Sequence, residues 1–492
     1  MRNAHPARLN RTTRRSFVKL AAAGALLASS VPFRKAWAQS SATRSSPLDN
    51  LPSLDGELVF DDASRQANAV DNGGYVRRAP MAVLKPRSVN DIVRVVGYAN
   101  KRGLKIAMRG QGHSHSGQAL VEGGLVIDSS TLNAVRLHGN DALDAQPGAL
   151  WGDAAKASLA QGMTPPVMVD AMMLTVGGTL SVGGTGETSY RFGAQVDHVL
   201  ELDVVTGAGE LVTCSPERND ELFRMVLAGL GQCGIIVRAR LRLIQAPKYV
   251  AMRTLTYDDM DTFLSDQARL MAVDALGPLN GRATREKDGQ PRFALIAGSF
   301  VADADSVNRP PDWMSGLRFR SEAPAAAVPY ADYLSRRTAG QMANTAAVKR
   351  GTTNPSFVLT LPDTSIRPFL THVLSTPETF IGIWLLEVSP KITARHTQPL
   401  QKMPAGATSF ELRMQRRASS ADAPEHKAIL AANQELLPRL LAAGGKIYPP
   451  FAPILSKEQW HQHYGAETWQ RFAAAKKRFD PNNVLTPGAG IF

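Results

Sequence analysis

Two histidines in a glycine-rich turn stand out as side chains that could do chemistry. The stretch RGQGHSHSGQA, residues 109–119, places His113 and His115 among three glycines, directly after the apolar segment LKIAM. Backbone N–H groups at Gly110 and Gly112 can converge on an anion, because successive amides in such a turn form a concave nest suited to phosphates. The turn therefore predicts close approach of backbone to an anionic ligand, with imidazoles beside it.

A second glycine-rich stretch, LTVGGTLSVGGTGETSYRFG at residues 174–193, holds six glycines in twenty residues. It is too hydrophobic for a linker and too glycine-rich for a core strand, so it suits backbone wrapped around a flat ligand. One such stretch alone would favour tight turns. Two of them, both after predicted strands, favour a nucleotide. The polar side chains that these stretches offer are Gln111, Ser114, Gln118, Thr175, Thr179, Ser181 and Thr185.

A carboxylate in apolar surroundings is the third candidate. Asp170 lies in PPVMVDAMMLTVGG, five residues before Thr175. Burial among Val, Met, Ala and Leu would raise the pKa of this carboxyl and suit it to general-base work. An N-cap or turn carboxylate is the alternative, and the residues alone favour it.

The elements that must position these residues alternate between short strands and short helices from Ala79 to about Gln245. Ser88 predicts a helix N-cap, with Ile92, Val95, Val96 and Ala99 on one face and Gly103 as the stop. A hairpin turning at Gly207–Gly209, a helix near residues 220–228 and a long strand GIIVRARLRLI follow.

One motif resembles a dinucleotide fingerprint and is rejected. GLGQCG, with Gly229, Gly231 and Gly234, fits G-x-G-x-x-G. That fingerprint needs a strand before it and a helix after it. Here the predicted order is reversed, so the motif indicates a tight helix-to-strand turn.

The N-terminus has the layout of a bacterial twin-arginine signal peptide. TRRSFVK is followed by the short apolar run LAAAGALLASS and the small-residue site AWA. Residues 1–39 hold eight Lys/Arg and no Asp/Glu, so the formal charge of +13 falls by eight to +5 on the rest of the chain. Nucleic acid is not expected as a partner. A twin-arginine route carries folded proteins, often with a cofactor loaded, and predicts a periplasmic or secreted enzyme.

Composition narrows the remaining classes. A chain of 492 residues with 44% hydrophobic and 20% charged residues is typical of a globular protein of two or three domains. Its two cysteines, Cys214 and Cys233, leave no Cys-based metal or iron–sulfur site, and both are expected to be plain buried residues. No metal site, internal repeat or transmembrane helix is expected.

These motifs together resemble the flavoproteins of the vanillyl-alcohol oxidase / PCMH-type superfamily, and within it the cytokinin dehydrogenases. The likeness is carried by RGQGHSHSGQA, LTVGGTLSVGG, LELDVVTGAGELVTCSPE, LAGLGQCGIIVRARLRL, VPYADYL and the C-terminal EQWHQHYGAETWQRFAAAKKRFDPNNVLTPGAGIF. It implies an α+β, two-domain PCMH-type FAD-binding fold with a separate α+β substrate domain. The expected segments are a signal peptide 1–39, a linker 40–75, an FAD-binding domain 76–246, a substrate domain 247–440 and a C-terminal segment 441–492 that returns to the FAD domain.

The resemblance also implies roles for single residues. His113 corresponds to the histidine bonded covalently to the 8α carbon of FAD, and His115 is expected to be structural. Asp170 corresponds to the base that takes a proton from a substrate amine as hydride leaves the neighbouring carbon. FAD contacts are implied for Gly110, Gln111, Gly112, Ser114, Gln118, Asp170, Thr175, Ser181, Thr185, Ile236 and Tyr448.

The resemblance leaves the substrate and the electron acceptor open. Gly277 or a neighbour stands where a glutamate helps hold adenine in the plant enzymes, and Ala489 stands where a glutamine contacts flavin. The favoured substrate is an N6-alkenyl adenine, converted to adenine and an aldehyde. The alternatives are a sugar, alditol or aromatic alcohol oxidase of the same superfamily, and a periplasmic ligand-binding protein without catalysis. The acceptor is oxygen or a quinone.

Overall fold

The predicted helix after Ser88 illustrates how local sequence sets this fold. In the computed structural model, helix α2 (Val89–Arg102) starts at Ser88, whose side chain accepts a hydrogen bond from the Asp91 N–H in a capping box. It ends at Gly103, which has a left-handed φ of 68°. Ile92 and its predicted face are buried.

The structure describes residues 48–274, 276–286 and 288–492. The predicted signal peptide at residues 1–39 lies outside the described residues. Residues 50–492 form one unit by their contacts, so every site discussed below lies within that unit.

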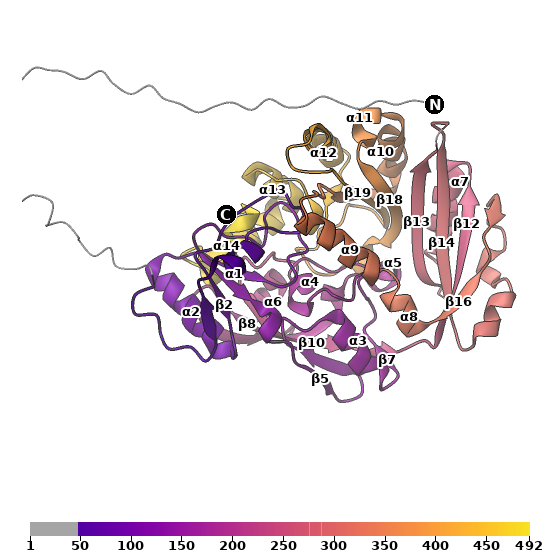
Figure 1. Cartoon of the computed structure of the whole chain (residues 1–492). Helices are drawn as coiled ribbons and strands as arrows, with labels where there is room; N and C mark the ends of the chain where they lie inside the picture. Colours follow the sequence, from indigo (N-terminus) through magenta and orange to yellow (C-terminus); the bar gives the residue numbers. More distant parts are fainter. Residues whose placement is uncertain (1–47, 275, 287) are drawn as a thin grey trace, which may run out of the picture. The chain divides into compact units, whose positions relative to one another are not determined.

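Two small sheets and their helices make up the part of the chain before residue 246 (Figure 1). The four-stranded sheet has the order β1 (Glu57–Val59), β2 (Ala82–Lys85), β4 (Leu125–Asp128), β3 (Ile106–Arg109), with β2–β4–β3 parallel. The five-stranded antiparallel sheet has the order β5 (Val135–His138), β6 (Ala142–Ala145), β10 (Ile235–Arg242), β8 (Val199–Val205), β9 (Leu211–Cys214). A two-stranded pair joins β7 (Met163–Thr164) to β11 (Ile244–Gln245). The remaining helices here are α1 (Asp62–Ala67), α3 (Trp151–Leu159), α4 (Val176–Leu180), α5 (Ser189–Phe192) and α6 (Asp220–Val226).

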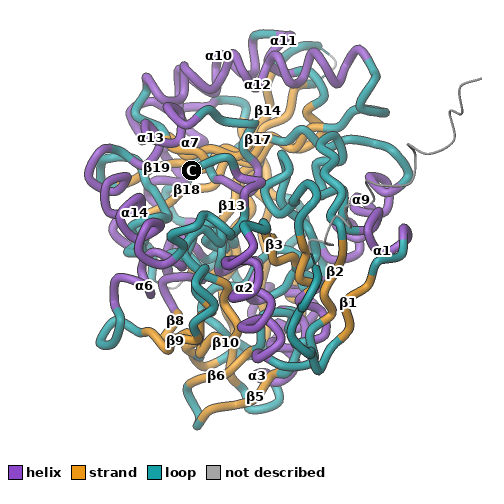
Figure 2. The backbone as a smooth tube through the Cα atoms, turned by 90° about the vertical axis from the view of Figure 1, so that its left-hand side faces the viewer, coloured by secondary structure: helices purple, strands orange, loops and turns teal. Residues whose placement is uncertain are grey.

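A nine-stranded sheet dominates the rest of the chain. Its path is β15 (Ser321–Glu322), β12 (Tyr249–Tyr257), β14 (Pro291–Val301), β13 (Leu276–Arg285), β18 (Ile383–Ile392), β19 (Thr408–Arg416), β17 (Phe357–Pro362), β20 (Lys446–Ile447), and β16 (Ala326–Pro329) also pairs with β12. Its neighbouring strands pair antiparallel. The helices are α7 (Met260–Leu270), α8 (Tyr330–Ser335), α9 (Thr338–Lys349), α10 (Asp363–Ser375), α11 (Pro377–Phe380) and α12 (Pro424–Ala442). Figures 1 and 2 both show α10, α11 and α12 grouped together, and α10 and α12 contact β17.

The C-terminal tail pairs with one of the parallel strands. Helices α13 (Lys457–Tyr464) and α14 (Ala466–Phe479) are followed by an extended tail that bridges β3. The Ile106 N–H donates to the Val484 carbonyl at 2.8 Å, and the Thr486 N–H donates to the Ile106 carbonyl at 2.7 Å. Segments from both ends of the described chain therefore meet at the strand that delivers the histidine turn.

This architecture confirms the α+β prediction. The hairpin between β8 and β9 turns at Gly207–Gly209, and GLGQCG joins α6 to β10 as the helix-to-strand turn predicted for it. Both cysteines are buried and free, as expected. Among the helices that the structure describes, none is long and apolar enough to cross a membrane.

Candidate active site

The histidine turn follows β3 and is held by close backbone contacts. A Cβ atom on Gly110 would lie 2.1 Å from the Thr175 Oγ1 atom, so only glycine lets the turn lie against the second glycine-rich stretch. Gly112 has a φ of 62°, a conformation that side chains with a Cβ rarely adopt. Gly110 thus lets the two predicted stretches lie in contact, and Gly112 lets the turn lie against the Arg109 side chain.

The C-terminal segment anchors the other side of this turn. The His115 N–H donates to the Pro450 carbonyl at 2.8 Å, and the Ser116 hydroxyl donates to the Ala452 carbonyl at 2.7 Å. The Gln118 side chain donates to the Pro449 carbonyl. His115, Ser116 and Gln118 are thus hydrogen-bonded to one short segment, residues 449–452, which lies more than 330 positions later in the chain.

The two histidines occupy different surroundings. His115 is 1% exposed, and its ring packs edge-on against Phe451 at 4.7 Å between centroids. Burial, with the charge of a protonated His113 as a smaller cause, lowers the pKa of His115 to about 3. Burial and the nearby Arg413 lower the pKa of His113 to about 4. Both imidazoles are therefore neutral at pH 7, and a neutral imidazole keeps a lone pair for nucleophilic attack.

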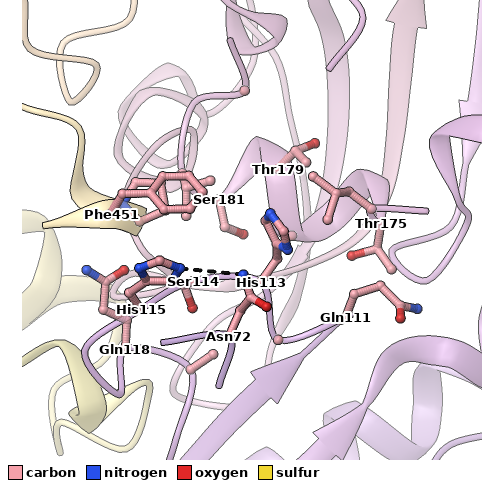
Figure 3. A pocket seen from close by; sticks show the side chains of 18 of the residues that line it. Asn72, Gln111, His113, Ser114, His115, Gln118, Thr175, Thr179, Ser181 and Phe451 are labelled. Carbon is pink, nitrogen blue, oxygen red and sulfur yellow. Dashed lines mark hydrogen bonds between the residues drawn. The ribbon is translucent and has the colours of Figure 1, made fainter. Parts of the chain in front are cut away.

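One cavity collects every residue for which the resemblance implied a role. The space open to the centres of water molecules in it is about 200 Å³. Figure 3 shows the His113 ring toward the side lined by Ser181 and Thr175, whereas the His115 ring lies toward Gln118 and Phe451. The predicted residues that line this cavity are Gly110, Gln111, Gly112, His113, Ser114, Gln118, Asp170, Thr175, Ser181, Thr185, Ile236 and Tyr448.

The donors on one wall of the cavity fit the anionic and polar parts of FAD. Within the part of the chain that the structure describes, the backbone N–H groups of residues 111–114 donate no hydrogen bond to protein. The Oε1 atom of Gln118 and the Nδ1 atom of His115 are buried without a partner among the described residues. Four adjacent free amides suit a pyrophosphate, and unpaired buried polar atoms call for a polar ligand.

Tyr448 closes the cavity near the second glycine-rich stretch. Its hydroxyl accepts a hydrogen bond from the Gly184 N–H at 3.2 Å, and its ring stacks on Phe451 at 6.1 Å. Burial raises the pKa of this phenol to about 12. Tyr448 is therefore neutral at physiological pH and can serve only as a hydrogen-bonding wall.

Asp170 lines the same cavity and is paired rather than isolated. Its Oδ2 atom accepts a hydrogen bond from Arg337 Nη1 at 3.1 Å, and its side chain is 20% exposed. Its Oδ1 atom accepts no hydrogen bond from the described residues. Burial raises the pKa of this carboxyl, but Arg337 first, and then Arg413, Arg336 and Lys391, outweigh it and lower the pKa overall. The prediction of a raised pKa is wrong, because the sequence did not reveal these cations.

Asp170 belongs to a cluster of eight charged side chains, which we call the charged cluster. Four are carboxylates and four are cations, so their formal charges cancel. Every carboxylate in it other than Asp170 is at most 5% exposed. Its members are Asp170, Glu187, Arg336, Arg337, Glu387, Lys391, Glu411 and Arg413.

Sequence reasoning missed several residues that line the cavity from elsewhere in the chain. They come from the residues before β2, from α9, β18 and β19, and from the turn Pro449–Phe451, and no glycine pattern or motif marks them. Most carry amides or aromatic rings. They are Asn72, Gln341, Asn344, Trp384, Arg413, Gln415 and Phe451. Across the described residues, no cluster of three or more His, Cys, Asp or Glu side chains could hold a metal ion.

Comparison with known proteins gives this geometry a context. Residues 80–215 match the family model described as FAD binding domain, and residues 302–492 match the model described as cytokinin dehydrogenase 1, FAD and cytokinin binding. An uncharacterized oxidoreductase from the fasciation locus of Rhodococcoides fascians is 35% identical over 441 residues, covering 88% of this chain and 99% of that protein. Cytokinin dehydrogenase 4 of Oryza sativa subsp. japonica is 31% identical over 495 residues, covering 89% and 90%. Cytokinin dehydrogenase 1 of Arabidopsis thaliana is 30% identical over 484 residues, covering 89% and 83%.

A solved structure shares the fold at lower identity. The 6-hydroxy-D-nicotine oxidase of Arthrobacter nicotinovorans superposes with a TM-score of 0.65 and 21% identity, covering 88% of this chain and 97% of that one. The predicted PCMH-type fold and the resemblance are thereby confirmed. The chain belongs to the cytokinin dehydrogenase family and is an FAD-dependent oxidoreductase.

Proposed function

We propose that this enzyme oxidises a C–H bond next to a secondary amine, with an N6-alkenyl adenine as substrate. One observation carries the proposal: Asp170, a carboxylate with a free oxygen, lines the same cavity as His113 and the unpaired amides of the histidine turn. A base and a cofactor pocket thus share one space. The relatives named cytokinin dehydrogenases, which align over most of their length, support this substrate class.

The proposed chemistry divides between cofactor and protein. FAD, when bound, supplies the acceptor for the hydride that leaves the substrate carbon. Asp170 accepts the amine proton at Oδ1, so that the C–N bond becomes C=N. Water then hydrolyses this imine to adenine and an aldehyde. Oxygen or a quinone takes the two electrons afterwards. Because Asp170 is ionised at neutral pH, it is ready to accept that proton without a prior ionisation step.

Several side chains that line the cavity suit a planar heteroaromatic ring. Amides of Asn and Gln offer a donor and an acceptor side by side, which can pair with the ring nitrogens of adenine and leave the single N6–H for Asp170. An aromatic side chain offers a stacking surface. These amide-bearing and aromatic residues are Asn72, Gln341, Asn344, Trp384 and Gln415.

We also propose that FAD is held covalently, through an imidazole nitrogen of His113 and the 8α carbon. The neutral state of His113 and its place on the cavity wall support this role. In the test, purified protein is precipitated with acid and the yellow colour is followed. Wild-type pellets stay yellow, and His113→Ala pellets turn colourless. Colour released from both proteins would contradict the covalent link.

We propose export by the twin-arginine route from the signal-like layout of residues 1–39, and the enzyme would then reside in the periplasm or outside the cell. Replacing Arg14 and Arg15 with lysine should retain the folded, flavin-loaded protein in the cytoplasm. Cell fractionation measures this, and unchanged export of the double variant would contradict it.

The substrate assignment is tested by anaerobic bleaching of the flavin absorbance. N6-isopentenyladenine, a sugar or alditol, and an aromatic alcohol are mixed in turn with the oxidised enzyme. We expect bleaching by the adenine derivative. Bleaching only by a polyol or an aromatic alcohol would replace the proposal with the corresponding oxidase, and a colourless protein would indicate ligand binding without catalysis.

A further inference from the structure

Arg337 is the centre of the charged cluster and is the residue in contact with the proposed base. It lies in the two-residue link between α8 and α9. Its Nη1 atom contacts Asp170 Oδ2 at 3.1 Å and Glu387 Oε1 at 3.0 Å, and its Nη2 atom contacts Glu187 Oε1 at 2.8 Å. One guanidinium thus binds three carboxylates from three different segments.

Two of these carboxylates are fixed by further hydrogen bonds. Glu187 Oε2 accepts from the Tyr333 hydroxyl at 2.6 Å, and Glu387 Oε1 accepts from the Asn280 amide at 2.9 Å. The side chains of Glu187 and Glu387 are 5% and 3% exposed, whereas that of Asp170 is 20% exposed. The guanidinium is therefore held from the buried side, and Asp170 is its partner toward the cavity.

We infer that Arg337 is a positioning residue for Asp170: its ion pair to Oδ2 fixes the carboxylate, keeps it ionised and leaves Oδ1 for the substrate proton. This inference rests on the proposed role of Asp170 as base. Nothing in the sequence motifs marks Arg337, which follows the landmark VPYADYL by three residues.

The cluster also explains how a buried carboxylate can gain a proton at low cost. When Asp170 becomes neutral, Arg337 still pairs with Glu187 and Glu387, so no unpaired cation is left in a buried site. The other charged groups that act on Asp170 are Arg336 beside α8, Lys391 on β18, and Glu411 and Arg413 on β19. The phenol of Tyr333 is a neutral group nearby.

The test compares the pH dependence of kcat/KM for the holoenzyme and its Arg337→Gln variant, with N6-isopentenyladenine as substrate. An arginine beside an aspartate lowers the pKa of that carboxyl by about 1–3 units. In the variant we therefore expect the apparent pKa of the acid limb, where kcat/KM falls at low pH, to move to higher pH by about 1–3 units. We also expect kcat to fall more than KM changes. Arg337→Lys keeps the charge and should restore part of the shift.

Arg336→Gln is the matched control, because Arg336 binds Glu187 at 2.5 Å and does not contact Asp170. Arg336→Gln should shift the acid limb of the kcat/KM profile by less than half of the shift expected in Arg337→Gln. Infrared spectra across the pH range give a readout that does not depend on turnover. The carboxylic acid band that Asp170→Asn removes should appear at higher pH in Arg337→Gln than in wild type. If Arg337→Gln does not fold, the same comparison is made with Arg337→Lys, which should then shift the band by a smaller amount in the same direction.

The outcomes separate this inference from the proposed function. Full activity of Asp170→Asn would overturn the proposed base and this inference with it. An inactive Asp170→Asn, together with an acid limb and an infrared band that do not move in the Arg337 variants, would overturn the positioning role alone.

Discussion

Two parts of the cavity wall are built on different physical terms. The part with the histidine turn offers backbone amides, glycines and two neutral imidazoles, and Arg413 of the charged cluster lies near His113. The part with Asp170 is held by eight charged side chains whose formal charges cancel. The histidine turn can bind a ligand through its backbone amides. The charged cluster sets the protonation state of Asp170.

This difference explains why the enzyme can hold a large cofactor and still move protons. Backbone donors need no change of state and give a fixed pocket for the flavin. A carboxylate that accepts and releases a proton needs surroundings that tolerate both of its charges. Predictions that break or sharpen this contrast follow, from the largest expected effect to the smallest.

Removing one buried cation should damage the charged cluster most. Lys391 is 4% exposed in its side chain and lies 3.8 Å from Glu411. Lys391→Met leaves the cluster with an extra negative charge, so we expect a loss of about 3–5 kcal/mol in the free energy of unfolding. Urea denaturation of the holoenzyme at pH 7 measures it.

Arg478→Met is the control, because the Arg478–Glu221 pair is exposed and should contribute less than about 1 kcal/mol. Equal losses for the two variants would mean that burial of the cluster does not matter to stability.

Adding a side chain should damage the histidine turn by shape alone. In Gly110→Val the new Cβ meets Thr175 Oγ1, and overpacking of this kind costs about 1–3 kcal/mol. We expect the ratio of flavin to protein absorbance to fall sharply while the protein remains folded. Gly97→Ala is the matched control, since a Cβ there meets nothing within 4 Å. Normal flavin content in Gly110→Val would contradict the role given to this turn.

The neutral histidines should make stability depend on pH. The pKa of His115 is about 3 in the folded protein, well below its ordinary value of 6.5. Between these two pKa values the imidazole is protonated in the unfolded chain and neutral in the folded chain. The contribution of His115 to the free energy of unfolding is therefore complete above about pH 6.5 and is lost as pH falls. The loss from one such group is about 1.4 kcal/mol per pH unit.

His115→Asn should reduce the slope of unfolding free energy between about pH 6 and 4 by this amount, measured by denaturation at each pH. A slope that is the same in wild type and His115→Asn would show that His115 is charged in the folded protein.

The same contrast decides what the sequence could predict. Features that depend on neighbours in the chain were predictable. They are the N-cap of α2 at Ser88, the end of α2 at Gly103 and the turn at GLGQCG. Most predicted FAD contacts lie in the two glycine-rich stretches, with Ile236 and Tyr448 outside them, and a family resemblance could point to them.

The charged cluster was not predictable from the chain alone. Asp170 and Arg337 are 167 positions apart, and an arginine in a helix link carries no sign of its partner. Without Arg337, burial was the one influence on Asp170 that the sequence showed, so the direction of its pKa was predicted wrongly. The direction of the pKa shift of Asp170 is decided by charged partners that tertiary structure brings together, and the local sequence pattern does not show them.

The most direct test of the account mixes oxidised enzyme with N6-isopentenyladenine in the absence of oxygen and follows flavin absorbance in a single turnover. Wild type and Asp170→Asn should show the same flavin content before mixing. A general base contributes about 10²–10⁴-fold, so the variant should bleach at least about 100-fold more slowly. Equal bleaching rates in the two proteins would contradict the account.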